Sequence, residues 1–306
     1  MINGILNVYK EPGFTSHDVV AKLRGITCQK KIGHTGTLDP AATGVLPVCL
    51  GKATKVCAFL TEQDKTYEAI LLLGTTTDTQ DATGNTLRQA DSEDLKNIAP
   101  EAAVAAILSF TGVSFQIPPM YSALKKNGKK LYEYARAGVE IERASRKITI
   151  SDIRIIDIEL PRIRFSVTCS KGTYIRTLCD DIGRKLGVGG CVETLKRTRV
   201  GVFNIENSLT LREIEDASRD GQLNDILIGI DSMFEEFPSV TVAEEYNKLL
   251  YNGCPVPADD RKTADSKARL YDMEKRFIGL YELNEGVYRP IRLFLDREEI
   301  SVNNQA

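Results

Sequence analysis

The chain has 306 residues, of which 42% are hydrophobic and 27% charged, a composition typical of a globular protein with one or two well-formed cores. No apolar run approaches the roughly 20 residues of a membrane-spanning helix, and the N-terminus does not read as a signal peptide. Seven cysteines without a CxxC pair and only two histidines disfavour a zinc site and favour reduced thiols in a cytoplasmic protein.

The formal net charge of −2 hides an uneven distribution of charge. Residues 121–200 contain 18 Lys and Arg against 9 Asp and Glu, whereas residues 201–306 contain 12 against 21. A polyanion such as a nucleic acid could bind the basic middle and ignore the acidic C-terminal third. A solvated charged face would give the same count, so the charge alone leaves both interpretations open.

The first hundred residues predict a helix, a glycine-rich loop and a strand. Thr15 to Asp18 form a capping-box pattern, which starts a short helix ending near Gly25. The glycine-rich segment 33–44 indicates a loop, and the apolar segment 45–60 is expected to be buried. Residues 66–74 indicate a strand. The polar, turn-rich segment 75–99 predicts an exposed loop or a mobile insertion.

The following residues predict further helices and a pair of strands. Pro100 opens a helix that runs to residue 110. Segment 116–130 is expected to be extended or looped because two prolines disfavour helix, and 131–138 indicates a short helix. Residues 146–160 and 162–170 alternate like paired strands, and 173–187 fit a helix that stops at a glycine. A second module with short strand-like segments begins near residue 238.

Three residues stand out as candidates for catalysis: Asp39, Tyr67 and Arg176. Asp39 precedes Pro40 inside GHTGTLDPAATG, where glycines allow another chain or ligand to approach closely. Tyr67 begins a predicted strand, and Arg176 lies in SKGTYIRT, where a strand passes into a helix with unpaired N–H groups. Taken singly, each has an ordinary explanation: a turn-forming aspartate, a core tyrosine and a surface ion pair.

One other motif does not match the consensus that it resembles. LGKAT (50–54) resembles the end of a phosphate-binding loop, but Leu46 stands where that loop needs glycine, and Ala53 follows the lysine instead of Ser or Thr. Nucleotide hydrolysis is therefore rejected. Because histidine is scarce, any catalysis is expected to depend on acidic, tyrosine, arginine or lysine side chains.

Long blocks of the sequence resemble the TruB family, the tRNA pseudouridine synthases that modify uridine 55. The block GHTGTLDPAATGVLPVCLGKATK resembles the catalytic motif of that family. KTYEAILLLGTTTDTQDATG, PPMYSALKKNGKKLYEYARAG, CSKGTYIRTLCDDIG and LKRTRVGVF resemble successive family blocks in the same order. The resemblance covers most of residues 1–205. One departure is that the family's early Lys-Pro-x-Gly appears here as Lys10-Glu11-Pro12-Gly13.

The resemblance implies an α+β pseudouridine-synthase fold. Its central sheet would be mixed, largely antiparallel and flanked by helices, and a small C-terminal β-rich PUA-like module would follow. Residues 1–237 would form the catalytic domain and residues 238–306 the RNA-binding module. The substrate would be the T-arm of tRNA. The family needs no cofactor or metal and no obligatory protein partner, and the expected protein is a cytoplasmic monomer that does not bind membranes.

The resemblance also implies roles for individual residues. Asp39 matches the nucleophile, Tyr67 the tyrosine that stacks on the target base, and Arg176 the arginine that pairs with the aspartate. Residues that match substrate-binding positions are His34, Tyr174, Leu195, Lys171 and Lys10. The basic middle would contact phosphates, with Lys125, Lys126, Lys129 and Lys130 as candidates.

A physical argument supports an arginine beside the aspartate. A free aspartate titrates at about 3.9, burial would raise its pKa, and a nearby opposite charge would restore the ionised form that a nucleophile needs. A planar guanidinium suits this better than lysine. Two alternatives remain: the same chemistry on another RNA, as in guide-dependent relatives, and a non-catalytic RNA-folding protein with the same fold.

Overall fold

The computed structural model describes residues 1–258 and 266–295, so residues 259–265 and 296–306 of the expected second module lie outside the described residues. The helices are α1 (Ser16–Thr27), α2 (Cys57–Glu62), α3 (Ser92–Lys96), α4 (Pro100–Leu108), α5 (Leu131–Arg136), α6 (Ile175–Lys185), α7 (Leu211–Arg219) and α8 (Asn247–Tyr251). The strands are β1 (Gly4–Lys10), β2 (Ile32–His34), β3 (Thr43–Leu50), β4 (Lys65–Leu73), β5 (Thr75–Thr77), β6 (Thr86–Gln89), β7 (Gly112–Gln116), β8 (Lys125–Lys126), β9 (Lys129–Lys130), β10 (Arg146–Glu159), β11 (Arg162–Cys169), β12 (Gly190–Val200), β13 (Phe203–Asn204), β14 (Ser239–Thr241), β15 (Val256–Pro257), β16 (Lys267–Tyr271), β17 (Phe277–Asn284) and β18 (Val287–Leu293).

A nine-stranded sheet forms the centre of the molecule, with the order β1-β3-β12-β4-β11-β10-β7 and with β2 and β13 paired at its side. Its pairs are antiparallel except β3 with β12, which run parallel over only two residue pairs. Gly44 makes that short junction possible, because a Cβ atom there would lie 2.2 Å from the Arg197 carbonyl oxygen and its φ is +103°. The sheet is mixed and largely antiparallel, as the sequence predicts.

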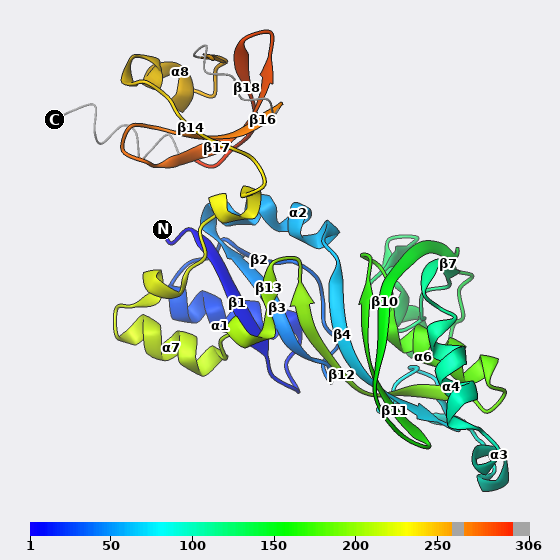
Figure 1. Ribbon diagram of the computed structural model, residues 1–306. Helices are drawn as coiled ribbons and strands as arrows, with labels where there is room; N and C mark the ends of the chain where they lie inside the picture. Colours follow the sequence, from blue (N-terminus) through cyan, green and yellow to red (C-terminus); the bar gives the residue numbers. More distant parts are fainter. Residues whose placement is uncertain (259–265, 296–306) are drawn as a thin grey trace.

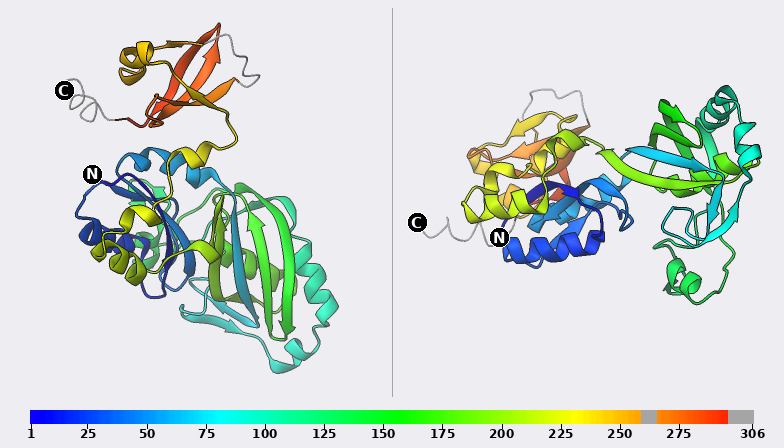
Figure 2. Two further views of the ribbon diagram at one scale, coloured as in Figure 1. Left: turned by 60° about the vertical axis from the view of Figure 1, so that its left-hand side comes forward. Right: turned by 90° about the horizontal axis from the view of Figure 1, so that it is seen from below.

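The short junction divides the sheet into two halves (Figures 1 and 2), and β4 and β12 run between them. In the first half, β1 and β3 are buried on both faces, although β1 also contains Asn7 and Lys10. Helices α1 and α7 cover one face through Val19, Leu23 and Ile214. Residues from β3, the 3₁₀ segment Gly51–Val56 and α2 form the core on the other face. Continuous apolar strands such as β3 are expected where both faces are covered.

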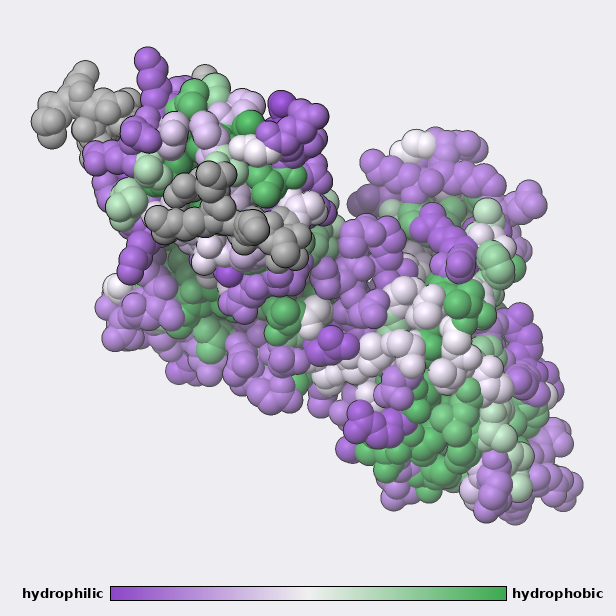
Figure 3. Space-filling model, turned by 45° about the horizontal axis from the view of Figure 1, so that its top comes forward, coloured by the Kyte–Doolittle hydropathy of each residue, from purple (hydrophilic) through white to green (hydrophobic). Residues whose placement is uncertain are grey.

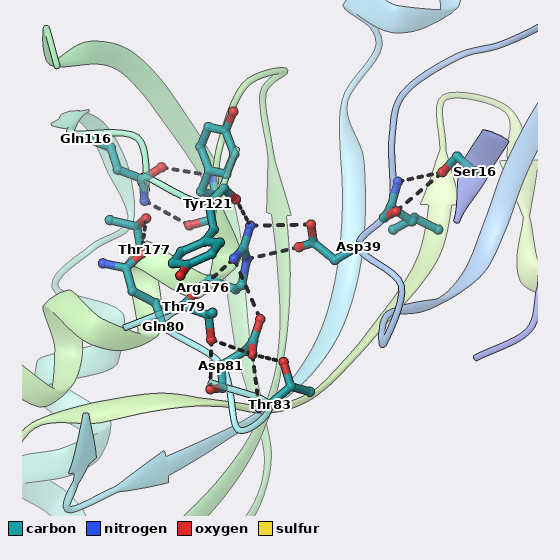
Figure 4. A network of polar contacts seen from close by, with 12 residues as sticks. Ser16, Asp39, Thr79, Gln80, Asp81, Thr83, Gln116, Tyr121, Arg176 and Thr177 are labelled. Atoms are coloured by element: carbon teal, nitrogen blue, oxygen red, sulfur yellow. Dashed lines mark hydrogen bonds and ion pairs between the residues drawn. The ribbon is translucent and has the colours of Figure 1, made fainter. Parts of the chain in front are cut away.

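The second half is covered by helices on one face. Apolar residues of α4 and α6, including Ile107, Leu178 and Ile182, pack against β4, β10 and β11. Residues 163, 165 and 167 of β11 are buried and alternate with more exposed ones, the period-two pattern of a sheet with one covered face. The N-terminal end of α6 in this half faces the loop between β2 and β3 in the first half (Figure 4).

The C-terminal module has a five-stranded sheet in the order β14-β16-β17-β18-β15 and a core of its own. It sits above α2 in Figure 1. Four phenylalanines make the junction: Phe59 and Phe234 from the first part of the chain, and Phe277 and Phe294 from the module, with ring centroids 5.4 to 6.3 Å apart. The Lys55 ammonium also donates to the Leu293 carbonyl at 2.8 Å.

Several predicted elements are confirmed. The Thr15 hydroxyl accepts from the Asp18 N–H at 3.1 Å and closes the capping box, although α1 continues to Thr27, two residues past Gly25. The strand at 66–74 and the strand pair on either side of Pro161 are present, as are the helices that begin at Pro100, Leu131 and Ile175. The glycine-rich loop is shorter than predicted, because β2 and β3 take up its two ends.

Segment 75–99 contains regular structure that its polar composition did not suggest. It forms the β5–β6 hairpin followed by α3. The turn of the hairpin is attached to β12, because Ala82 N–H donates to Val192 O at 2.8 Å and Val192 N–H donates to Gln80 O at 3.1 Å. Strand β12 itself was not predicted, although it holds the two halves of the sheet together.

Hydrophilic residues predominate over the face of the molecule shown in Figure 3, where the most extensive apolar area lies at the lower right. Among the described residues, no helix has the length and apolar character needed to span a membrane.

Candidate active site

The loop that carries Asp39 is fastened through its backbone to the first half of the molecule. The buried Ser16 hydroxyl, at the start of α1, accepts from the Leu38 N–H at 2.9 Å. On the other side of Asp39, the Pro40 carbonyl accepts from the Gly13 N–H at 3.0 Å and from the Lys10 ammonium at 3.2 Å. The Asp39 side chain is 41% exposed and points across the gap towards α6 (Figure 4).

Arg176, in the first turn of α6, meets Asp39 with two nitrogens. Its Nε lies 2.9 Å from Oδ2 of Asp39, and its Nη2 donates to Oδ1 at 3.3 Å. The Arg176 side chain is only 6% exposed and is held from its own half as well. Nη1 donates to Thr79 O at 2.8 Å and lies 3.6 Å from Oδ2 of Asp81, while Nη2 also donates to Tyr121 O at 2.7 Å. The guanidinium is therefore held in place by contacts that do not involve Asp39 (Figure 4).

The surroundings of Asp39 raise the pKa of its carboxyl group above the ordinary value. Desolvation by the walls of the site is the largest cause, and the negative charge of Asp81 adds to it. Arg176 is the main opposing influence, followed by Lys10. The expected arginine is thus in place, but it only partly offsets the effect of burial on the pKa.

Asp39 and Arg176 lie at a cleft of about 420 Å³ that also contains Asp81, Thr43 and Leu195. Cavities that bind small molecules begin at about 300 Å³, so the cleft can take a group the size of a nucleotide base. Its walls come from both halves of the sheet. The residues predicted from distant blocks of the sequence therefore meet here because the sheet brings β3, β4, β12 and α6 together.

Tyr67 lies on β4, beside the cleft residue Leu195 in the core of the second half. Burial raises the pKa of the Tyr67 hydroxyl, and the neighbouring Arg197 opposes this rise. The negative charge of Asp39 is close enough to raise the same pKa. At neutral pH the Tyr67 hydroxyl is consequently protonated.

His34 and Tyr174 also lie near the cleft. The Gly36 N–H donates to Nδ1 of His34 at 3.3 Å, and the His34 ring meets the His17 ring edge-on with centroids 5.6 Å apart. Burial lowers the pKa of His34, so the imidazole is neutral at neutral pH. Tyr174 precedes α6, and the Gln116 side chain bonds its backbone N–H at 2.8 Å and its carbonyl at 3.0 Å.

The two predicted substrate-binding lysines, Lys10 and Lys171, do not line the cleft. Lys10 is completely buried, and its ammonium donates to the carbonyls of Glu11, Phe14 and Pro40. Burial lowers the pKa of Lys10 to about 8. The Lys10 ammonium thus faces backbone carbonyls and is not part of the cleft lining, and its contact with the substrate stays a prediction. Lys171 is exposed and forms an ion pair with Glu62 outside the cleft lining.

The basic residues expected to contact phosphates include a compact group. Lys125 and Lys126 on β8 pair with Lys129 and Lys130 on β9, which places four ammonium groups on one small hairpin. The hairpin follows directly after Tyr121, whose carbonyl holds Arg176. These four lysines thus form a basic cluster a few residues along the chain from a partner of Arg176.

Sequence reasoning missed several charged residues of the site, including Asp81, Glu68, Arg164 and Glu193 at the cleft and the buried Arg197. Asp81 contacts Arg176 and accepts from the Thr83 N–H at 3.0 Å and the Thr79 hydroxyl at 2.8 Å. The dense turn pattern DTQDATG was the available signal, but it was assigned to a loop. Arg197 is only 1% exposed, beneath Tyr67, and no pattern along the chain indicates that burial.

In the part of the chain that the structure describes, no group of three or more His, Cys, Asp or Glu side chains is arranged to hold a metal ion. The cleft instead offers the Asp39 carboxylate held by the Arg176 guanidinium, with Asp81, Glu68, Glu193 and Arg164 also in its lining. This arrangement suits nucleophilic attack by the carboxylate on a flat ring or its attached sugar.

Comparison with known protein families gives three consecutive matches. The TruB family pseudouridylate synthase N-terminal domain matches residues 24–175. The tRNA pseudouridylate synthase B C-terminal domain matches residues 176–235, and the pseudouridine synthase II TruB C-terminal domain matches residues 238–294.

Full-length relatives and solved structures agree with these matches. The chain is 50% identical to the tRNA pseudouridine synthase B of Lachnoclostridium phytofermentans, with 96% of this chain and 100% of the relative covered. It is 46% identical to the protein of that name from Clostridium acetobutylicum, with 95% and 99% covered. A crystal structure of a Cbf5-Nop10-Gar1 complex contains a chain with a TM-score of 0.70 and 27% identity, with 96% of this chain and 86% of that chain covered. The chain therefore belongs to the TruB family of pseudouridine synthases.

Proposed function

We propose that the protein converts uridine 55 in the T-arm of tRNA to pseudouridine, with Asp39 as the nucleophile. The observation that carries this proposal is the Asp39–Arg176 pair at the cleft, with distances of 2.9 and 3.3 Å, in a member of the TruB family. The relatives named tRNA pseudouridine synthase B support tRNA as the substrate.

The reaction moves a glycosidic bond within one nucleotide. The bond from uracil N1 to C1′ breaks, the base turns, and a bond from C5 to C1′ forms. A proton leaves C5 and a proton is taken up at N1, so atoms and electrons balance without an oxidant, a reductant or a leaving group. On this stoichiometry the reaction requires no cofactor.

Asp39 would attack the sugar C1′ or the uracil C6 in its ionised form. Arg176 supports that role in two ways. Its positive charge opposes the rise in the pKa of Asp39, and its two contacts fix the rotation of the carboxylate. Because Arg176 is itself held by Thr79, Tyr121 and Asp81, the carboxylate is oriented before the substrate arrives.

Binding must first bring the base out of the folded RNA, at a cost on the order of a few kcal/mol. Stacking on an aromatic ring recovers about 1–3 kcal/mol, and Tyr67 is the ring beside Leu195 and Asp39. The C5 proton would leave to water, because the Tyr67 hydroxyl already carries its own proton at neutral pH. His34 and Tyr174 would contact the nucleotide at the cleft, and the β8–β9 lysines and Lys171 would bind phosphates without reading the sequence.

In this proposal residues 1–237 form the catalytic domain, and residues 238–306 form a PUA-like module that binds another part of the tRNA. The protein would act in the cytoplasm as a monomer, without an obligatory protein partner. The solved Cbf5 relative is in a complex with Nop10 and Gar1, so independence from partners is a point that the assay must address.

The test uses the purified full chain and a T-arm hairpin transcript. We expect pseudouridine at the position of uridine 55, measured by mass spectrometry of nuclease digests, with no added protein, guide RNA or metal and with EDTA present. Asp39→Asn should remove turnover and leave hairpin binding within about threefold of wild type.

Each negative result would identify an alternative. Modification of another uridine, or of another RNA only, would favour a synthase with a different substrate. Hairpin binding without any product from the wild-type chain would favour an RNA-folding protein. Substantial product from Asp39→Asn would remove Asp39 from the role of nucleophile.

A further inference from the structure

Arg197 is a buried arginine that joins the Asp39 loop to Tyr67. It lies on β12 at the junction of the two halves of the sheet, paired in register with Gly44 on β3 and with Tyr67 on β4. Its side chain is 1% exposed. The guanidinium thus lies in the interior at the short junction where β12 pairs both with the strand that carries Tyr67 and with the strand that follows the Asp39 loop.

The hydrogen bonds of Arg197 reach both ends of the Asp39 loop. Its Nε donates to Val45 O at 2.8 Å, and its Nη2 donates to Gly36 O at 3.2 Å. Gly36 and Val45 stand on either side of Asp39 in the sequence, and Ser16 and Lys10 bond the loop between them. A single planar group therefore sets the separation of the two loop ends.

The charge of Arg197 is not explained by an ion pair. Within residues 1–258 and 266–295, no carboxylate lies within salt-bridge distance of its guanidinium. Burying a cation without an opposite charge is costly, and an apolar residue of similar length would fill the same space at less cost. We therefore expect the arginine to act on the side chains and loop that surround it.

The groups around Arg197 belong to the proposed active site. Its charge acts on Tyr67, where it opposes the effect of burial on the pKa of the hydroxyl. It also acts on His34 and Lys10, whose pKa values it lowers, and on Lys65 behind Tyr67. Tyr67 and Lys65 lie on β4, which lines the cleft, and Lys10 and His34 lie on β1 and β2, which pair with the cleft strand β3.

We propose that Arg197 is a positioning residue of the reaction, which holds the two ends of the Asp39 loop beside Tyr67, its register partner on β4. The proposal rests on the proposed function. Arg197 does not touch the substrate, because it is buried beneath both groups. It acts instead by keeping the nucleophile and the stacking ring in one arrangement, where a misplacement of about 1 Å can cost roughly 100-fold in rate.

The test compares Arg197→Lys with Arg199→Lys, a matched control on the same strand. Arg199 also makes two hydrogen bonds, to the Thr66 hydroxyl and the Gly201 carbonyl, both at 3.1 Å, but it does not bond the Asp39 loop. Single-turnover rates, hairpin dissociation constants and melting temperatures are measured for both variants and for wild type.

We expect Arg197→Lys to slow the single-turnover rate by about 10- to 100-fold and to change the hairpin dissociation constant by less than about threefold. Lysine keeps the charge but reaches only one of the two carbonyls well. Arg199→Lys should stay within about twofold of the wild-type rate at a similar loss of melting temperature. Arg197→Gln, which keeps a planar donor without the charge, replaces the lysine variant if the latter does not fold.

Equal rates for Arg197→Lys and Arg199→Lys would overturn the inference, and so would a rate loss of Arg197→Lys that is matched by weaker hairpin binding. These results are distinct from failure of the proposed function, because that failure would appear as absence of pseudouridine with the wild-type chain.

Discussion

The replacement Arg176→Lys tests how the Asp39 carboxylate is kept ready for attack. Arginine has five N–H donors in a plane, whereas lysine has three donors at one point. The three guanidinium nitrogens of Arg176 contact Asp39, Thr79 O, Tyr121 O and Asp81. A lysine ammonium cannot reach both Asp39 oxygens and both carbonyls, so at least one hydrogen bond to Asp39 and one to a carbonyl should be lost.

The expected effect on activity follows from the lost hydrogen bond. A bond from a charged donor contributes about 1.5–3 kcal/mol, and the lower end applies because the Asp39 side chain is 41% exposed. One pKa unit corresponds to about 1.4 kcal/mol. The pKa of Asp39, already raised by burial, should rise further, because the ionised form loses a donor. Since only ionised Asp39 attacks, the acid limb of the rate profile should move upward by about one pH unit.

The assay is a single-turnover pH profile on the T-arm hairpin at constant ionic strength, together with chemical denaturation. The plateau rate at high pH should also fall, since the carboxylate loses its fixed rotation. A carbonyl left unpaired should reduce the free energy of unfolding by about 1–3 kcal/mol. An acid limb at the wild-type position, with full rate at its plateau, would refute the view that Arg176 controls the charge and orientation of Asp39.

Three further predictions concern the framework of the site. Gly44→Ala should unfold the junction of the sheet or lower the free energy of unfolding by about 3 kcal/mol or more, because its Cβ would lie 2.2 Å from the Arg197 carbonyl; a melting temperature like that of wild type would contradict this. Ser16→Ala should leave the Leu38 N–H without its 2.9 Å acceptor, cost about 1–3 kcal/mol and slow turnover more than it weakens RNA binding, which denaturation and single-turnover kinetics would show. Tenfold higher salt should weaken hairpin binding steeply in the wild type, and replacing the four β8–β9 lysines by alanine should reduce the slope of log Kd against log salt; an unchanged slope would exclude this hairpin from phosphate binding.

The elements with strong local signals were predictable from the sequence. The capping box at Thr15 and Asp18, Pro100 at the start of α4, and Gly187 after α6 each act within a few residues, and the structure contains all three helices. The alternating segments on either side of Pro161 likewise became β10 and β11. Resemblance to a known family added the meeting of Asp39 with Arg176, which are 137 residues apart in the chain.

The parts that depend on tertiary contacts were not predictable by the same means. Strand β12 contains register shifts near Val192 and near Arg197, so its side chains do not keep a period of two, and its buried arginine reads as a surface residue. The turn that contains Asp81 looks like a solvated loop, because its partners Val192 and Arg176 lie far along the chain. Lys10 was assigned to the substrate through the family resemblance, and nothing in the sequence indicates that three backbone carbonyls surround its ammonium.

The phenylalanine junction above α2 affects how the protein can be divided. Phe234 and Phe294 are 5% and 2% exposed, and they share one core with Ile5 and Val45 of the central sheet. Cutting the chain at residue 237 would uncover the buried Phe234, at a cost of up to about 1.5–3 kcal/mol, and would further expose Phe59, which is already 37% exposed, so the shortened enzyme should be prone to aggregate. The same packing joins the C-terminal sheet to the first half of the central sheet, so an RNA that contacted both that sheet and the cleft would have to span the separation between them.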